Sequence, residues 1–212
     1  MNKKGLELTA KEDIKEGFLS KENIINNYTG SSKDVIIPSK IDGVVITEIK
    51  GKSFWKNELN SIVIPDSVTK IGRYPFAYNN LTEIIIPSKI KVIADNAFYH
   101  NKLTEVTIPE GVTVIEYGAF MYNSLRKVTI PGTVTVIKSH SFAFNLLTEL
   151  NLMDEVVEIA ELAFICNELI YVNIPYSVRA IESEAFYWNG PNSDAYPVFS
   201  ENLQKFLDSM ET

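Results

Sequence analysis

The chain has 212 residues, of which 45% are hydrophobic, and a formal net charge of −7 from 27 acidic and 20 basic residues. Its acidic balance and the lack of a basic block argue against a nucleic-acid partner, because binding nucleic acid depends on neutralising phosphates. No run approaches the roughly 18 apolar residues of a membrane helix, so no membrane insertion is expected. The lone Cys166 excludes an intrachain disulfide framework and a cysteine-rich zinc site.

Residues 1–34 precede the repeat described below and are predicted to form an N-terminal cap. Residues 5–14 mix leucines with charged residues where a secretion signal would be apolar. We therefore expect a cytoplasmic protein if Met1 is the native start, and a secreted or cell-surface protein if the chain is a trimmed part of a longer one. Residues 9–17 have the spacing of a helix capping box, but residues 18–28 favour a strand, a turn and a strand, which is the preferred interpretation.

The repeats begin at Val35 with a modified unit. Pro38 and Pro65 are 27 positions apart, whereas later prolines follow at steps of 22, and the five extra residues include Asp42-Gly43. This dipeptide is a strong β-hairpin signal. The first coil is therefore expected to belong to the cap.

The array over residues 35–189 repeats every 22 residues. A period between 20 and 50 residues is typical of a solenoid built from stacked supersecondary units. Two residue types mark each of the seven predicted coils. They are Phe54, Phe76, Phe98, Phe120, Phe142, Phe164 and Phe186, with Asn57, Asn79, Asn101, Asn123, Asn145, Asn167 and Asn189.

The units share the consensus A-F-x-x-N-x-L-x-x-I-x-I-P-x-x-V-x-x-I, with a few departures such as Pro75 for Ala and Leu152 for Ile. The L-x-x-I-x-I segment is predicted to be a strand with its Leu and Ile side chains inward, and we call this side of the coil the strand face. Proline ends that strand, except where Met153 replaces it, and the V-x-x-I pair brings the chain back along what we call the return face. The Asn amides are expected to satisfy buried backbone groups at the bends and to bond to one another in a ladder.

Residues Leu103–Phe120, LTEVTIPEGVTVIEYGAF, resemble the BspA-type leucine-rich repeat, a bacterial and protist subclass, and residues 28–54 resemble the start of such arrays. The resemblance spans residues 28–189. It implies a leucine-rich-repeat solenoid of the α/β horseshoe class, rich in β-structure, with about seven coils, a parallel β-sheet on the concave face and caps at both ends. It also implies a surface-displayed array used in adhesion and host contact.

The period stops after Asn189, at Gly190-Pro191. Ser200 is a candidate N-cap for an amphipathic stripe that consists of Leu203, Phe206, Leu207 and Met210. Residues 190–212 are therefore predicted to form a C-terminal cap with a short helix over the last coil.

No catalytic or metal site is predicted. His100 and His140 belong to different columns two coils apart, so roughly 10 Å of stacking separates them. Cys166 lies three coils from His100, which excludes a histidine–cysteine pair. The protein is expected not to be an enzyme and to need no cofactor or metal.

Functional interest falls on the outward columns, where the repeat imposes no residue type. On the strand face, Lys127 is expected between Glu105 and Glu149, so the alternatives are a solvated face with self-paired charges and a concave surface for a protein partner. The candidate partner-binding residues are Glu83, Ile85, Glu105, Thr107, Lys127, Thr129, Glu149, Asn151, Tyr171 and Asn173.

A second candidate is an aromatic column two positions after the repeated Phe. Its rings either stack and stiffen the corner or form an exposed apolar stripe for a protein or a sugar. The column consists of Tyr78, His100, Tyr122, Phe144 and Trp188. Three hypotheses follow: a non-enzymatic protein-binding module of the surface or adhesion type, a module that binds carbohydrate or cell wall through the aromatic column, and a structural spacer within a larger surface protein.

Overall fold

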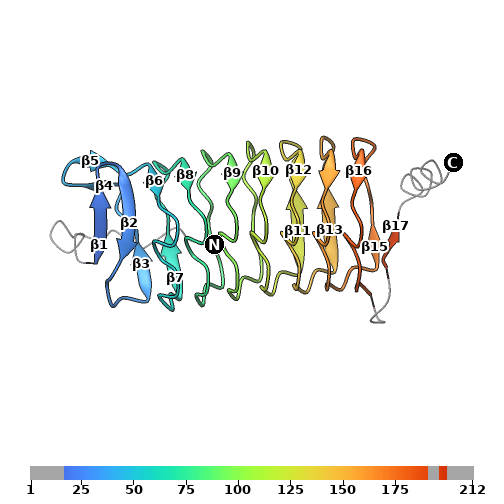
Figure 1. Cartoon of the computed structure of the whole chain (residues 1–212), viewed down its shortest axis with the longest axis horizontal. Helices are drawn as coiled ribbons and strands as arrows, with labels where there is room; N and C mark the ends of the chain where they lie inside the picture. Colours follow the sequence, from blue (N-terminus) through green and yellow to red (C-terminus); the bar gives the residue numbers. More distant parts are fainter. Residues whose placement is uncertain (1–16, 191–195, 200–212) are drawn as a thin grey trace, which may run out of the picture.

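The computed structural model describes residues 17–190 and 196–199. It is a β-solenoid in which successive coils stack along the long axis, from the N-terminal hairpin at one end to β17 at the other (Figure 1). Within the described residues the coils consist of strands and turns and contain no helix. The α/β part of the expected class therefore does not apply to them, because the return face, like the strand face, is built from strands.

The return face carries the more continuous hydrogen-bond ladder. Its parallel strands form one sheet in the order β2-β6-β8, extended by β1, and a second in the order β16-β14-β12-β10-β9. Pairs such as Val114 with Val136 stand 22 positions apart, so like positions of successive coils are in register. The strands are β2 (Ile24–Tyr28), β6 (Glu48–Ile49), β8 (Lys70–Ile71), β9 (Val92–Ile93), β10 (Val114–Ile115), β12 (Val136–Ile137), β14 (Glu158–Ile159) and β16 (Ala180–Ile181).

The strand face is interrupted, which corrects the expectation of one parallel sheet there. Its strands pair only two at a time, as β3-β7, β11-β13 and β15-β17. The coils contribute no strand over residues 81–87 and 103–109. Along these residues they do not form the backbone hydrogen-bond ladder with a neighbouring coil that defines a β-strand. The strands are β3 (Asp34–Ile36), β7 (Ser61–Val63), β11 (Lys127–Ile130), β13 (Glu149–Leu152), β15 (Tyr171–Val172) and β17 (Val198–Phe199).

Two hairpins form the N-terminal end. Strands β1 (Phe18–Lys21) and β2 pair antiparallel, which confirms the preferred strand, turn and strand interpretation. Strands β4 (Lys40–Ile41) and β5 (Val44–Val45) pair antiparallel around Asp42-Gly43, both of which have positive φ, as a type I′ turn requires. Phe18 and Tyr28 pack against each other with ring centroids 5.2 Å apart, and Tyr28 stacks on Phe54 at 5.5 Å. The hairpin thus covers the first ring of the core.

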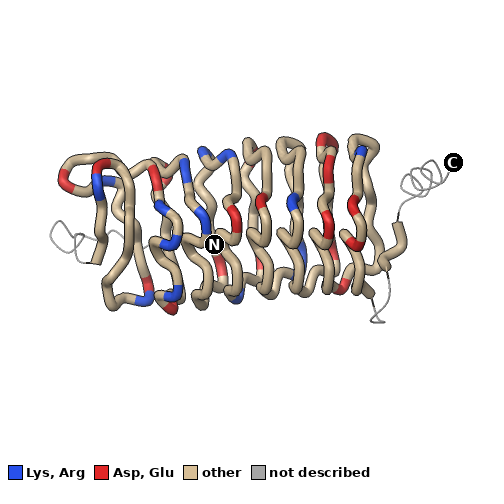
Figure 2. Tube along the Cα trace, in the orientation of Figure 1, with Lys and Arg blue, Asp and Glu red and all other residues tan. Residues whose placement is uncertain are grey.

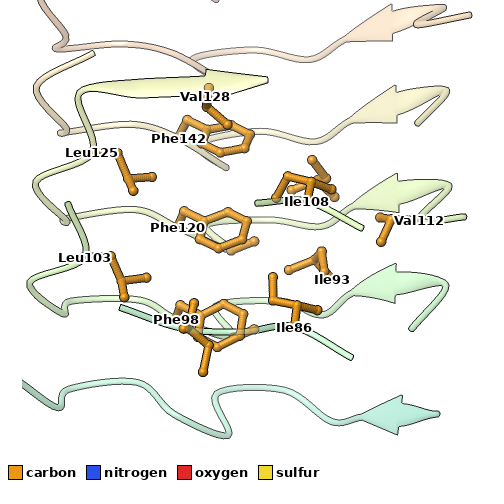
Figure 3. Close-up of a cluster of buried hydrophobic side chains, with 14 of the residues drawn as sticks. Ile86, Ile93, Phe98, Leu103, Ile108, Val112, Phe120, Leu125, Val128 and Phe142 are labelled. Carbon is orange, nitrogen blue, oxygen red and sulfur yellow. The ribbon is translucent and has the colours of Figure 1, made fainter. Parts of the chain in front are cut away.

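The core is organised around the Phe column. Phe98 and Phe120 stack with centroids 5.3 Å apart and Phe120 and Phe142 at 5.2 Å. The rings lie between leucines such as Leu103 and Leu125 on one side and Ile86, Ile93, Ile108 and Val112 on the other (Figure 3). At the C-terminal end Phe199 of β17 lies edge-on to Phe186 at 5.3 Å. The predicted helix after Ser200 lies outside the described residues.

The Asn column joins each coil to the one before it. In one example, Asn145 Nδ2 donates to the carbonyl oxygens of Phe120 and Phe142 at 3.0 and 3.1 Å, and its Oδ1 accepts from the Leu125 N–H at 3.1 Å. This confirms that the amides satisfy buried backbone groups of both kinds. The expected amide-to-amide bonds do not occur among the described residues, because the Phe carbonyls and the Leu N–H already occupy the amide. We call the bend from the residue before the repeated Phe to this Asn, 97–101 in one coil, the Phe–Asn corner.

Left-handed backbone flanks the Phe column on both sides. The residues two before and two after each repeated Phe have φ between 51 and 64°. This conformation suits Gly and Asn, and it costs other residues roughly 1–2 kcal/mol. The two columns are Lys52, Tyr74, Asn96, Gly118, His140, Leu162 and Glu184, and Lys56, Tyr78, His100, Tyr122, Phe144, Cys166 and Trp188.

Candidate functional site

One outward column of the strand face is mostly acidic at its N-terminal end. The sheet register places Asp34 beside Ser61, whose hydroxyl donates to the Asp34 carboxylate at 2.7 Å. Glu83 and Glu105 continue the column one coil at a time and are exposed. Within the described part of the chain neither makes an ion pair or a side-chain hydrogen bond. This end of the column thus presents carboxylates that the described residues do not neutralise.

The same column is self-paired further along. Lys127 Nζ lies 2.6 Å from Glu149 Oε1, and Asn151 Nδ2 donates to the same oxygen at 3.0 Å. The Lys127 hydrogen bond, followed by that of Asn151, holds the pKa of Glu149 below its ordinary value. Lys127 therefore pairs with Glu149 and makes no ion pair with Glu105, although the sequence places it between the two. Tyr171 follows as an exposed ring.

The second outward column changes from apolar to polar along the axis. Ile36, Val63 and Ile85 are 50%, 54% and 84% exposed, and β3 and β7 pair Ile36 directly with Val63. The next coils present Thr107, Thr129, Asn151 and Asn173 in the equivalent positions. The structure thus brings the predicted strand-face residues together on one surface. Its N-terminal half carries apolar and acidic side chains, and its C-terminal half carries the Lys127–Glu149 pair and polar residues, followed by the exposed Tyr171 and Val198 at the end.

Two clefts lie where the strand-face ladder is interrupted. Residues Ser61–Asp66 and Glu83–Ile85 line the first, of about 390 Å³. Residues Glu105–Glu110, Lys127, Thr129, Pro131 and Met153 line the second, of about 470 Å³. Each cleft therefore has a carboxylate and apolar side chains in its wall.

Three residues of this surface were missed in the sequence. Asp34 and Ile36 stand 27 positions before their partners in the sheet, and the five-residue insertion moves them out of the 22-residue step. Allowing for that insertion would have found them. Met153 lines the second cleft, and the signal for it was the break in the proline column.

The aromatic column contains stacked pairs of rings. Tyr78 and His100 stack with centroids 5.0 Å apart, and Tyr122 and Phe144 stack at 4.5 Å. Between these two pairs, His100 and Tyr122 are tilted by 43° with centroids 6.1 Å apart, so the stacking is not continuous. Cys166 interrupts it before Trp188, which is 46% exposed and stacks on Tyr187 at 5.6 Å.

His140 and Cys166 are the remaining titratable candidates, and burial shifts the pKa of each. His140 Nδ1 lies 2.7 Å from Ser139 Oγ, and burial lowers the histidine pKa while Glu161 opposes the shift. Burial raises the pKa of the Cys166 thiol, which disfavours the reactive thiolate. Among the described residues no group of three or more His, Cys, Asp or Glu side chains is placed to hold a metal ion. Nor does this part of the chain contain a helix that could cross a membrane.

Solved structures similar to the chain include two leucine-rich-repeat proteins. A leucine rich cell surface protein from Faecalibacterium prausnitzii A2-165 has 25% identity and a TM-score of 0.58, over 77% of this chain and 47% of that one. A leucine-rich repeat protein from Bacteroides ovatus ATCC 8483 has 20% identity and a TM-score of 0.62, over 82% of this chain and 55% of that one. The chain thus spans about half the length of these two proteins.

The sequence itself also matches a repeat family. No curated protein matches the chain significantly. The profile described as "BspA type Leucine rich repeat region", in 6 copies, matches residues 47–165 and 91–206, which together cover well over half of the chain. With the 22-residue coil, the stacked Phe rings and the amide-linked corners, this match shows that the chain belongs to the BspA-type leucine-rich repeat family.

Proposed function

We propose that the chain is a non-enzymatic, protein-binding repeat module whose strand face engages a protein ligand. One observation carries the proposal: the inward positions of the coils keep one residue class, whereas the outward positions of the strand face include acidic, basic, polar, aliphatic and aromatic residues. Glu105, Lys127, Glu149 and Tyr171 occupy equivalent places in four successive coils. A surface that changes its chemistry at each step of roughly 5 Å can offer a partner several different contacts at once.

Binding to a protein ligand can be tested with a variant that changes the face but not the core. This variant replaces four exposed residues by Ser: Glu105, Lys127, Glu149 and Tyr171. Biolayer interferometry measures the affinity of each protein ligand for the variant and for wild type. We expect loss of binding. A control with Val92→Lys and Val157→Lys alters two exposed positions of the return face and should bind like wild type. Ligands that bind the strand-face variant unchanged would contradict the proposal.

We further propose that the module acts at a cell surface, in adhesion. The description of the Faecalibacterium prausnitzii protein as a cell surface protein supports this role. Treatment of intact source cells with protease, followed by mass spectrometry, should release peptides of this chain. Protection of the chain in intact cells, with release only after lysis, would contradict a surface role while leaving protein binding open.

The aromatic column supports a second, carbohydrate-binding function. The observation in its favour is the exposure of Tyr122 and Trp188 on the same corner. If this function is correct, a glycan array should give a signal with wild-type protein that is lost in Tyr122→Ala and Trp188→Ala. A blank array with the wild-type protein would remove this candidate.

A further inference from the structure

The apolar stripe of the strand face is its most unusual surface feature. Ile36, Val63 and Ile85 are three aliphatic side chains in neighbouring coils, and each is at least half exposed. Val63 and Ile85 also line one cleft, so the stripe continues into a depression between two coils. Burying such side chains under a partner would remove apolar surface from water, which favours association.

Carboxylates that form no ion pair within the described part of the chain run beside this stripe. Asp34, Glu83 and Glu105 lie in the neighbouring outward column, and Glu83 also lines the cleft that Val63 and Ile85 share. Glu83 and Glu105 occupy equivalent places in adjacent coils, where like charges are unfavourable. A partner that supplies positive charge here would therefore relieve a repulsion as well as form new contacts.

A pairing of a carboxylate with a positive charge already exists further along the same column. Strands β11 and β13, where Lys127 pairs with Glu149, form the longest ladder of the described strand face, with four paired residues. The coils that carry Glu83 and Glu105 side by side form no ladder at these residues. An ammonium or guanidinium group between Glu83 and Glu105 would occupy the place that Lys127 has beside Glu149.

We propose that Asp34, Ile36, Val63, Glu83, Ile85 and Glu105 form a docking surface for an extended, cationic segment of a partner protein, in which basic residues alternate with aliphatic ones. The inference rests on the proposed protein-binding function and names the class of partner. Side chains alternate between the two sides of an extended segment, so a segment along the boundary of the columns turns basic residues to one and aliphatic residues to the other. The surface spans three coil steps, roughly 15 Å, or about five extended residues.

Negative charge alone does not select this surface. Acidic residues also predominate on the coils of β13 to β16, as Figure 2 shows. There the strand face presents Asn151, Tyr171 and Asn173 instead of an aliphatic stripe, and on the return face Lys138 already pairs with Glu158 at 3.2 Å. Exposed Ile170 and Val198 lie at that end as well, but among the described residues only the N-terminal half has a row of aliphatic side chains in one outward column beside carboxylates without an ion pair in the other.

The test uses the full chain and three peptides: acetyl-(Lys-Val)₄-amide, acetyl-(Glu-Val)₄-amide and acetyl-(Lys-Ser)₄-amide. Biolayer interferometry should show that wild-type protein binds the Lys-Val peptide about tenfold more tightly than either of the others, a difference of about 1.4 kcal/mol. Binding should weaken as NaCl rises from about 50 to about 300 mM, because salt screens exposed charges.

Three double variants separate the contributions that the local charge, the apolar contacts and the overall acidity make to peptide binding. E83Q/E105Q and V63T/I85T should each lower the affinity for the Lys-Val peptide about tenfold. E161Q/E168Q removes two exposed carboxylates elsewhere and should bind like wild type. Circular dichroism melting must show that each variant folds as wild type does.

Absence of binding to the Lys-Val peptide, or equal losses in E83Q/E105Q and E161Q/E168Q, would overturn this inference. If a protein ligand were lost with the strand-face variant described above but kept by E83Q/E105Q and V63T/I85T, the docking surface would be wrong and the proposed function would stand. If no strand-face variant affected any ligand, both would fail.

Discussion

The Phe–Asn corner and the strand face belong to the same coils but repeat to different extents. At the corner, Phe and Asn recur in every coil, each ring stacks on the next, and each amide from Asn79 onward bonds to its own coil and to the one before it. On the strand face only the inward Leu and Ile positions recur, and the ladder is interrupted over two coils. The difference shows that the residues that repeat are those whose side chains pack or form hydrogen bonds between coils. Stability should therefore reside in the corner and recognition in the outward columns.

The largest loss of stability is expected from removing a ring of the Phe column. Phe120→Ala removes a fully buried ring that stacks on two others, and it should lower the free energy of unfolding by about 4 kcal/mol. Urea unfolding followed by circular dichroism measures this loss. Thr107→Ala, an exposed change on the strand face, should stay within about 0.5 kcal/mol of wild type. Equal losses for the two variants would contradict the division between corner and face.

The Asn column should give the next largest effect. Asn145→Ala leaves the Leu125 N–H and the Phe120 and Phe142 carbonyls without their amide partner, which should cost about 3 kcal/mol. Asn151→Ala, on the exposed strand face, removes the same side chain and should change stability by at most about 0.5 kcal/mol. Chemical denaturation of both variants tests the contrast, and a small cost for Asn145→Ala would mean that water replaces the amide.

The sequence predicts the corner well because packing and buried hydrogen bonds restrict its residues directly. Only a ring of fixed size continues the Phe stack, and the amide supplies two N–H donors and a separate acceptor oxygen from one short side chain. The 22-residue step therefore reports the register of the coils, as the pairing of Val114 with Val136 confirms. The β4–β5 hairpin was also predictable, because Asp42-Gly43 supplies the two positive-φ residues of its turn.

The strand face was less predictable because its backbone ladder depends on groups that the repeat does not restrict. Glu83 beside Glu105 and Lys127 beside Glu149 differ in charge but fit the same consensus, and only the second pair lies in a ladder. The left-handed columns were also hidden, because bulky residues such as Tyr122 occupy positions where Gly or Asn would have signalled the turn.

One of these left-handed columns allows a third test, because substitutions at two of its positions should change the stability in opposite directions. At Gly118, φ is +59° and an added Cβ would lie 2.5 Å from Asn96 Oδ1, so Gly118→Ala should destabilise the protein by about 2 kcal/mol. At Glu184, φ is 56° and the side chain is exposed, so Glu184→Gly should stabilise it by about 0.5 kcal/mol. Thermal unfolding of both variants gives the signs. If both changes destabilise, the backbone conformation is not what decides the residue in this column.

The smallest expected effect is a pH dependence at the corner. Burial lowers the pKa of His140 from its ordinary 6.5, against the smaller attraction of Glu161. Because the folded state then binds the proton less readily than the unfolded chain, unfolding becomes easier as pH falls below about 6.5 and the loss ends once pH passes the lowered folded value. Urea midpoints at pH 7.5 and pH 5 should therefore differ more for wild type than for His140→Gln. The difference should be small, because the ring is only partly buried and solvent screens its charge.

An unchanged difference in the variant would assign the pH dependence to other groups, such as the carboxylates of the strand face, and would leave the corner without a titrating residue.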